Sequence, residues 1–101
     1  MMLAETVPVS CGGDLAAVQA AARRLGRSID LGEGAVFEAV IAVSSLAHRL
    51  LVETPRTGEV ELSVIRLKAG RGLEARVVLA GGTGAPTTAA SVVIPPARLF
   101  S

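Results

Sequence analysis

Aromatic residues are scarce in this 101-residue chain, which contains two phenylalanines and neither tryptophan nor tyrosine. Proteins that bind single-stranded nucleic acid combine stacking aromatics with a basic surface, and a formal net charge of +1 supplies no such surface. We therefore expect no nucleic-acid partner. Because half of the residues are hydrophobic, the core must be built from alanine, valine, leucine and isoleucine.

Cysteine and histidine each occur once, as Cys11 and His48. A lone cysteine excludes an intramolecular disulfide and a cysteine-built metal site, and it is typical of the reducing cytoplasm, where we expect the protein. Cys11 has no basic or histidine neighbour in the sequence, so we interpret it as non-catalytic. His48 has no second histidine with which to complete a metal site, and we interpret it as a surface or core residue.

Long uninterrupted apolar segments are also missing. The chain starts without the basic and apolar regions of a signal peptide. Residues 35–52 form the most apolar segment, but Glu38, His48 and Arg49 interrupt it, so we expect no membrane span. The length predicts a single domain over residues 1–101, structured from about residue 5 to about residue 95, with a loose tail at 96–101.

The first half of the chain has the pattern of a strand followed by two helices. Residues 5–10 are predicted to form an edge strand, because a proline within them cannot donate to a ladder. Apolar spacings of three and four predict a helix over residues 15–25, with Asp14 as its N-cap. Gly26 either ends this helix or weakens its last turn. Asp30 and Glu33 have capping-box spacing and are predicted to open a second helix that ends near residue 53.

The second half alternates with a period of two, which is typical of strands. Strands are predicted over residues 59–64, 73–79 and 87–94, with a hairpin loop at 68–72 and a glycine-rich turn at 81–86. The order β-α-α-β-β-β predicts an α+β two-layer sandwich, in which two helices pack on one face of a mainly antiparallel four-stranded sheet.

The motifs occur in an order that resembles the anti-sigma-factor serine kinases of the GHKL ATPase superfamily, which act in bacterial partner switching. Those kinases carry Ser-Glu-Leu-Ala-x-Asn at the end of the second helix, a Gly-x-Val strand, and Asp-x-Gly-Pro-Gly after a later strand. Here the corresponding segments are Ser-Ser-Leu-Ala-His-Arg at 44–49, Gly-Glu-Val at 58–60, Arg-Gly-Leu-Glu at 71–74 and Gly-Thr-Gly-Ala at 82–85. The resemblance spans roughly residues 5–94 and rests on the order and spacing of these segments.

The resemblance implies a vestigial nucleotide site at Ser45, Arg49, Leu79, Ala80, Gly82 and Gly84. The family's glutamate acts as the general base and its asparagine holds Mg²⁺, and Ser45 and Arg49 stand at those positions. Serine has no base of its own here, and a guanidinium has no lone pair with which to ligate Mg²⁺. The aspartate that binds adenine corresponds to Leu79 or Ala80, depending on a one-residue choice of alignment, and neither can accept a hydrogen bond through its side chain.

A working family member also needs a lid loop, a helix facing the phosphates and a closing strand after its glycine turn. Residues 86–101, 16 in number, are predicted to form only a strand and a tail, so we expect the lid and that helix to be missing. We therefore expect no catalytic residue, no metal and no cofactor. We expect ATP and Mg²⁺ as cofactors only if the chain is a divergent kinase.

The same residues have simpler interpretations. Arg49 can reach solvent or pair with an acidic neighbour, or it can bind an anion in the former cleft, since arginine suits phosphate geometry. A loop joining two strands explains the glycines at 81, 82 and 84 as well as a phosphate-binding turn does.

These patterns favour a non-catalytic regulatory or protein-interaction domain. The resemblance implies a sigma factor, an STAS-domain antagonist or a phosphatase as its partner, and a second copy of the chain, giving a homodimer, is a further candidate. A mean hydropathy of +0.55 indicates that apolar residues remain exposed, at a sheet edge or on the solvent side of the helix layer. The alternatives are a divergent ATP-binding serine/threonine kinase that acts on an anti-sigma-factor antagonist, and an N-terminal fragment of a longer protein.

Overall fold

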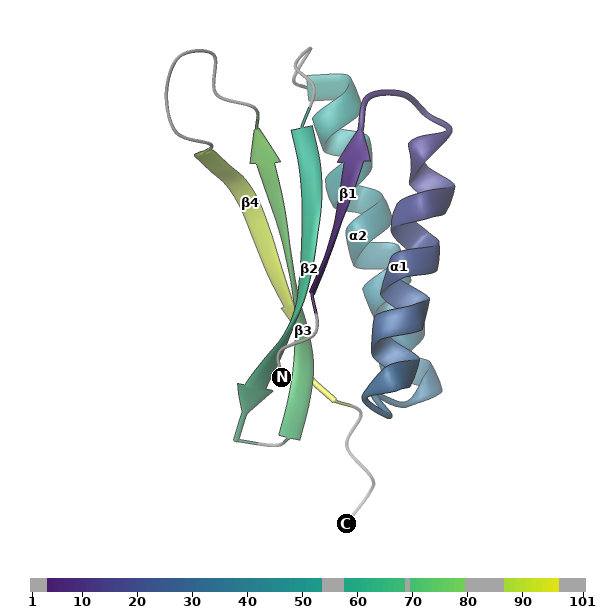
Figure 1. Cartoon of the computed structure of the whole chain (residues 1–101), viewed down its shortest axis with the longest axis vertical. Coiled ribbons are helices and arrows are strands. Elements are labelled where there is room, and N and C mark those ends of the chain that lie inside the picture. The colour runs from purple at the N-terminus through teal and green to yellow at the C-terminus, as the bar shows by residue number, and fades with distance from the viewer. Residues whose placement is uncertain (1–3, 54–57, 69, 80–86, 97–101) are drawn as a thin grey trace.

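The computed structural model describes residues 4–53, 58–68, 70–79 and 87–96. They form, in order, β1 (Ala4–Val9), α1 (Asp14–Ser28), α2 (Glu33–Glu53), β2 (Gly58–Leu67), β3 (Gly70–Leu79) and β4 (Thr87–Ile94). The strands make one antiparallel sheet in the order β1-β2-β3-β4, and both helices cover the same face of it (Figure 1). The predicted α+β two-layer sandwich is confirmed, and so is the position of the first strand at a sheet edge.

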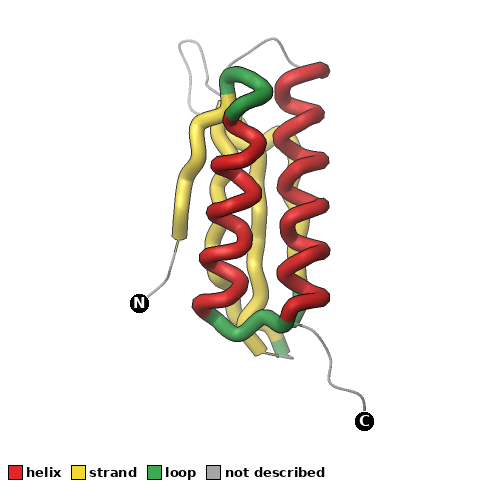
Figure 2. The backbone as a smooth tube through the Cα atoms, turned by 90° about the vertical axis from the view of Figure 1, so that its right-hand side faces the viewer, coloured by secondary structure: helices red, strands yellow, loops and turns green. Residues whose placement is uncertain are grey.

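The two helices lie side by side over the sheet (Figure 2). α1 packs mainly on β1 and β2, whereas α2 packs mainly on β3 and β4. An ion pair of 2.8 Å between Arg24 of α1 and Glu5 of β1 joins the helix layer to the edge strand. The opposite face of the sheet carries neither helix, so the domain has one covered and one open sheet face.

The described core contains only small and medium aliphatic side chains. Four alanines on the two helices, Ala21, Ala22, Ala39 and Ala47, are almost completely buried. Small residues on packed helices allow their axes to approach closely. The larger buried side chains with almost no exposed surface are Val9, Val18, Leu31, Val43, Val60, Leu62 and Leu73.

α1 continues through Gly26 to Ser28, so the prediction that it ends at residue 25 is wrong. Gly26 is buried, and a Cβ atom added there would lie 2.9 Å from Cγ2 of Val36 on α2. The glycine is therefore explained by the close approach of the two helices, which outweighs its low helix propensity.

α2 begins at Glu33, three residues after Asp30, so the predicted capping box is not formed. Asp30 has a φ of 53° and its N–H donates to the carbonyl of Arg27, while Gly32 has a φ of 96°. The carbonyl of Gly32 accepts the first helical hydrogen bond, from Val36 at 2.8 Å. The side chain of Glu33 instead pairs with Arg27 at 3.5 Å.

The hairpin between β2 and β3 is tighter than predicted. Leu67 pairs with Gly70, and Arg66 pairs with Arg71, so residues 70–72 belong to β3 and not to the loop. The last strand, Thr87–Ile94, has the predicted bounds.

By length and composition, residues Glu33–Val52 of α2 could cross a membrane, with a hydropathy of 1.7. The prediction that no segment is long and apolar enough to cross a membrane is therefore wrong. Core helices of soluble proteins pass the same test, and 39% of this window is buried within the fold. Part of the exposed surface of α2 is apolar, and this surface is described below.

Asp14 is the first residue of α1, and the N-cap is Gly13, so the predicted role of Asp14 as N-cap is wrong. Its carboxylate accepts hydrogen bonds from the backbone N–H groups of Ser10 at 2.8 Å and Cys11 at 3.2 Å, and from the Ser10 hydroxyl at 3.3 Å. The bond from the Ser10 backbone, followed by that from Cys11, lowers the pKa of Asp14 below its usual 3.8. The side chain thus fixes the turn between β1 and α1.

We predict that Asp14→Ala lowers the thermal stability of the domain at neutral pH, because the turn loses its acceptor. The folded-state pKa is depressed, so the contribution of Asp14 is complete above pH 3.8 and disappears as the pH falls through the lower folded-state value. Thermal unfolding of both proteins over this pH range measures the effect. Asp14→Asn keeps a side-chain acceptor and should lose less thermal stability than Asp14→Ala. A difference between wild type and Asp14→Ala that persists in acid would contradict this role.

Candidate functional site

The segment that corresponds to the kinase motif, residues 44–49, lies in the last turns of α2. Ser44 is half-buried there and joins the two helices: its hydroxyl donates to the carbonyl of Val40 at 2.6 Å and accepts from Nε2 of Gln19 on α1 at 2.9 Å. Both hydrogen bonds are made within the helix layer. Ser44 therefore has a structural role in this fold.

Ser45 and Arg49 lie one helical turn apart and are both exposed. Their neighbours Leu46, Ala47 and Leu50 are buried, so α2 directs these three residues into the core and the two predicted site residues outward. Arg49 also has an interaction within its own chain. The structure thus brings Ser45 and Arg49 together on the exposed part of α2.

Leu79 is half-buried at the end of β3, where it pairs with Gly58 of β2 and Thr87 of β4. A Cβ atom added to Gly58 would lie 3.1 Å from the methyl groups of Leu50 and 2.8 Å from the carbonyl oxygen of Val78. The last turns of α2 and the end of β3 therefore lie at the same end of the molecule, and Leu50 packs directly over Gly58. The other predicted positions, Ala80, Gly82 and Gly84, lie outside the described residues.

These positions offer little for phosphoryl transfer. Ser45 is a hydroxyl, Arg49 is a cation that only donates, and Leu79 has no polar side-chain atom. Among the described residues, no group of three or more His, Cys, Asp or Glu side chains could hold a metal ion. The residues that the structure places here include no general base, and neither Arg49 nor Leu79 has a side-chain oxygen with which to ligate Mg²⁺.

The outward surface of α2 carries a row of side chains whose apolar members were not predicted from the sequence. Phe37, Ile41 and Val52 expose 66%, 54% and 67% of their surface. Ser45 and His48 are exposed between them. We call these five residues the α2 stripe, because they recur at spacings of three and four along one side of the helix. Apolar residues lie around most of the circumference of α2, so the sequence alone does not show which of them are exposed.

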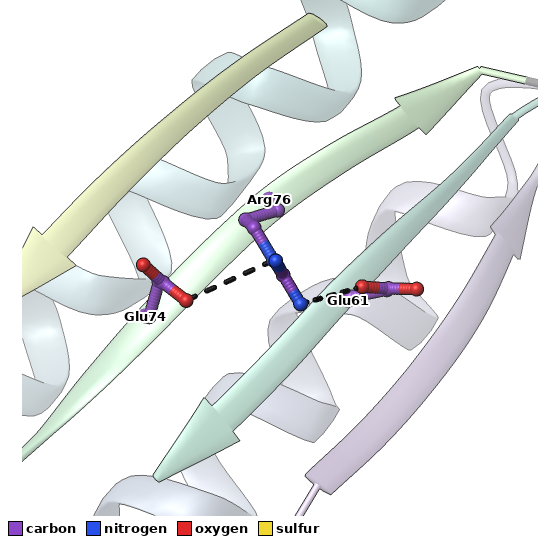
Figure 3. A network of polar contacts seen from close by, with 3 residues as sticks. All are labelled: Glu61, Glu74 and Arg76. Atoms are coloured by element: carbon purple, nitrogen blue, oxygen red, sulfur yellow. Dashed lines mark hydrogen bonds and ion pairs between the residues drawn. The ribbon is translucent and has the colours of Figure 1, made fainter. Parts of the chain in front are cut away.

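The open face of the sheet carries a cluster of three charged side chains. Arg76 of β3 lies between Glu61 of β2, at 3.0 Å, and Glu74 of its own strand, at 3.7 Å (Figure 3). Arg76 faces Glu61 directly in the β2–β3 register. The three side chains are half-buried and pair with one another, so we interpret them as stabilising the solvent side of the sheet.

A shallow depression of about 320 Å³ lies at the turn between α1 and α2, lined by Arg27, Asp30, Leu31, Gly32, Glu33 and Val36. Arg27 and Glu33 pair at its rim. Asp30 adds a second carboxylate to this lining, so the depression offers no cationic group beyond the paired Arg27 with which to bind an anion.

Comparison with known proteins adds no family assignment. No family model matches the chain, and no curated protein or solved structure matches it at a significant level.

We predict that Gly58→Ala destabilises the domain by about 1–3 kcal/mol, because the new methyl group meets the Val78 carbonyl and Leu50 in a tightly packed region. Chemical denaturation measures the change. Gly34→Ala is the matched control, since nothing lies within 4 Å of an added Cβ at that exposed position of α2. The control should be neutral or stabilising, by up to about 1 kcal/mol. Equal effects of the two variants would contradict close packing over Gly58.

Proposed function

We propose that the chain is a non-catalytic regulatory domain that binds another protein through the outward surface of α2. The observation that carries this proposal is the exposure of Phe37, Ile41 and Val52, three large apolar side chains on one side of one helix. Large apolar side chains that gather on one water-facing surface are typical of protein-interaction sites. Arg49 and His48 beside them add the polar groups that commonly border such sites.

The setting that we propose is bacterial partner switching in the cytoplasm. The order of the elements and the segments at 44–49 and 58–60 support it, through their resemblance to anti-sigma-factor serine kinases. By that resemblance, the partner is a sigma factor, an STAS-domain antagonist or a phosphatase, and a second copy of the chain fits the same surface. Ser45, Arg49 and Leu79 replace the residues that kinase chemistry requires, so regulation would proceed by binding alone.

We predict that a photo-crosslinking residue at position 37 captures a defined protein in cells. p-Benzoylphenylalanine in place of Phe37 keeps an aromatic ring at an exposed site and should not disturb the core. Glu59, which is exposed on the open sheet face, is the control position. The expected result is one discrete adduct at 37, identified by mass spectrometry, and none at 59. The proposal fails if position 37 gives no adduct or the same background as position 59.

The divergent-kinase alternative predicts nucleotide binding, since the end of α2 and the end of β3 share one end of the molecule. We expect no change in thermal unfolding with Mg-ATP or Mg-ADP at millimolar concentration. A nucleotide present at a hundred times its dissociation constant would stabilise the fold by about 2.7 kcal/mol. A stabilisation of that size would contradict the non-catalytic proposal and favour the kinase.

A further inference from the structure

Four residues of the α2 stripe, Phe37, Ile41, His48 and Val52, are placed symmetrically about the point between Ser44 and Ser45. Phe37 precedes Ser44 by seven residues and Val52 follows Ser45 by seven, while Ile41 and His48 stand three residues away on either side. Phe37 and His48 are 11 residues apart, and so are Ile41 and Val52. Eleven residues are close to three full helical turns, so the stripe runs nearly parallel to the helix axis.

This symmetry matches an antiparallel pairing of α2 with α2 of a second chain about a two-fold axis. In such a pair each contact occurs twice, because residue i of one chain meets residue j of the other and j meets i. With the axis between Ser44 and Ser45, Phe37 lies opposite Val52 of the second chain, and Ile41 lies opposite His48. The small serines fall at the crossing point, where two helices approach most closely.

The charges beside the stripe are complementary in the same arrangement. Glu38 and Arg49 each follow a stripe residue by one position, so both lie on the same flank of α2, about 100° around the helix. Both are exposed. In an antiparallel two-fold pair the same flanks of the two helices adjoin. Glu38 of one chain then lies within two residues, about 3 Å along the axis, of Arg49 of the other.

We propose that the α2 stripe binds a second copy of this chain, with the two α2 helices antiparallel and with two Glu38–Arg49 ion pairs between the chains. This inference rests on the proposed function and identifies its partner. Burial of Phe37, Ile41 and Val52 supplies the attraction, and the opposite charges determine the register. In a parallel two-fold pair the flank that carries Glu38 and Arg49 would lie on opposite sides of the interface in the two chains, so these ion pairs would not form.

Ile41→Lys is the first test, because it introduces a charge at the centre of the stripe where the folded chain exposes 54% of the side chain. Sedimentation equilibrium should show a dimer for wild type and a monomer for Ile41→Lys, with unchanged circular dichroism. Val93→Lys is the matched control: Val93 is 44% exposed on β4, directly opposite Glu74, and this variant should remain dimeric. A monomeric wild type, or a dimer that survives Ile41→Lys and is lost in Val93→Lys, overturns the proposal.

Charge reversal tests the register. Glu38→Arg and Arg49→Glu should each raise the dissociation constant by about tenfold, because each places like charges together at two symmetric sites. The double variant restores opposite charges and should regain most of the wild-type affinity at low salt. Arg49 also interacts within its own chain, so thermal unfolding of each monomer is measured alongside. If the dimer of the double variant is no tighter than the dimers of the single variants, the antiparallel pairing is contradicted.

Cysteine crosslinking distinguishes antiparallel from parallel helices. In a Cys11→Ser background, Phe37→Cys and Val52→Cys proteins should form a disulfide with each other after mixing and mild oxidation. Neither should form a disulfide when oxidised alone. The opposite result would show a parallel pair and overturn the proposal.

The remaining outcomes separate this inference from the proposed function. If the wild type is monomeric and position 37 crosslinks to a different protein in cells, the self-association proposal fails while the interaction domain stands. If the wild type is monomeric and floats with phospholipid vesicles, and Ile41→Lys abolishes flotation, the stripe binds a membrane surface and both proposals fail.

Discussion

The fold depends on close packing at both ends of α2. Near its start, Val36 lies against Gly26 of α1, and near its end, Leu50 lies against Gly58 of β2. At each contact a single added Cβ would come within 2.9–3.1 Å of the α2 side chain. Two glycines from two different elements therefore set how close this helix comes to its neighbours. The requirement follows from composition, since a core of alanine, valine, leucine and isoleucine has no large rings to fill a wider gap.

Such a thin core can bury only one side of α2. Val43, Ala47 and Leu50 are almost completely buried, whereas Phe37 and Ile41 on the other side are more than half exposed. The chain contains only two aromatic residues, both phenylalanine, and Phe37 lies outside the core. An isolated domain loses stability by exposing such a side chain, because burying it fully contributes about 1.5–3 kcal/mol to the free energy of unfolding. This distribution is the one expected of a helix that packs on both sides, once within the chain and once with a partner.

The periodicity of the sequence was sufficient to predict the layers and the bounds of β4, and the proline in the first strand was sufficient to predict its edge position. The errors involve residues whose role depends on distant neighbours. Asp30 and Glu33 have the spacing of a capping box, but positive φ angles at Asp30 and Gly32 move the start of α2. Gly72 was assigned to a loop, although it lies in β3, where an added Cβ would meet the Ile94 carbonyl at 2.6 Å.

The candidate site could be predicted only in part for the same reason. Helical spacing correctly placed Ser45 and Arg49 on one side of α2, but spacing does not show which side the fold covers. The mean hydropathy indicated that apolar residues remain exposed at a sheet edge or on the helix layer, but it did not identify Ile41 among them. That exposure depends on where α1 and the sheet lie, which is a property of the tertiary structure and not of the segment.

Two positions that the resemblance to kinases singles out lie on the same surface as the exposed stripe. Ser45 is a member of the stripe and Arg49 lies on its flank, and these are the positions at which the resembling kinases carry glutamate and asparagine. In the proposed dimer, position 45 lies at the two-fold axis, where glutamate would place two carboxylates against each other in a poorly solvated contact. Serine avoids that repulsion, and arginine at 49 supplies the charge that Glu38 of the second chain requires. If the chain derives from such a kinase, as we propose, the residues that exclude phosphoryl-transfer chemistry at positions 45 and 49 are also the ones that suit antiparallel association of α2.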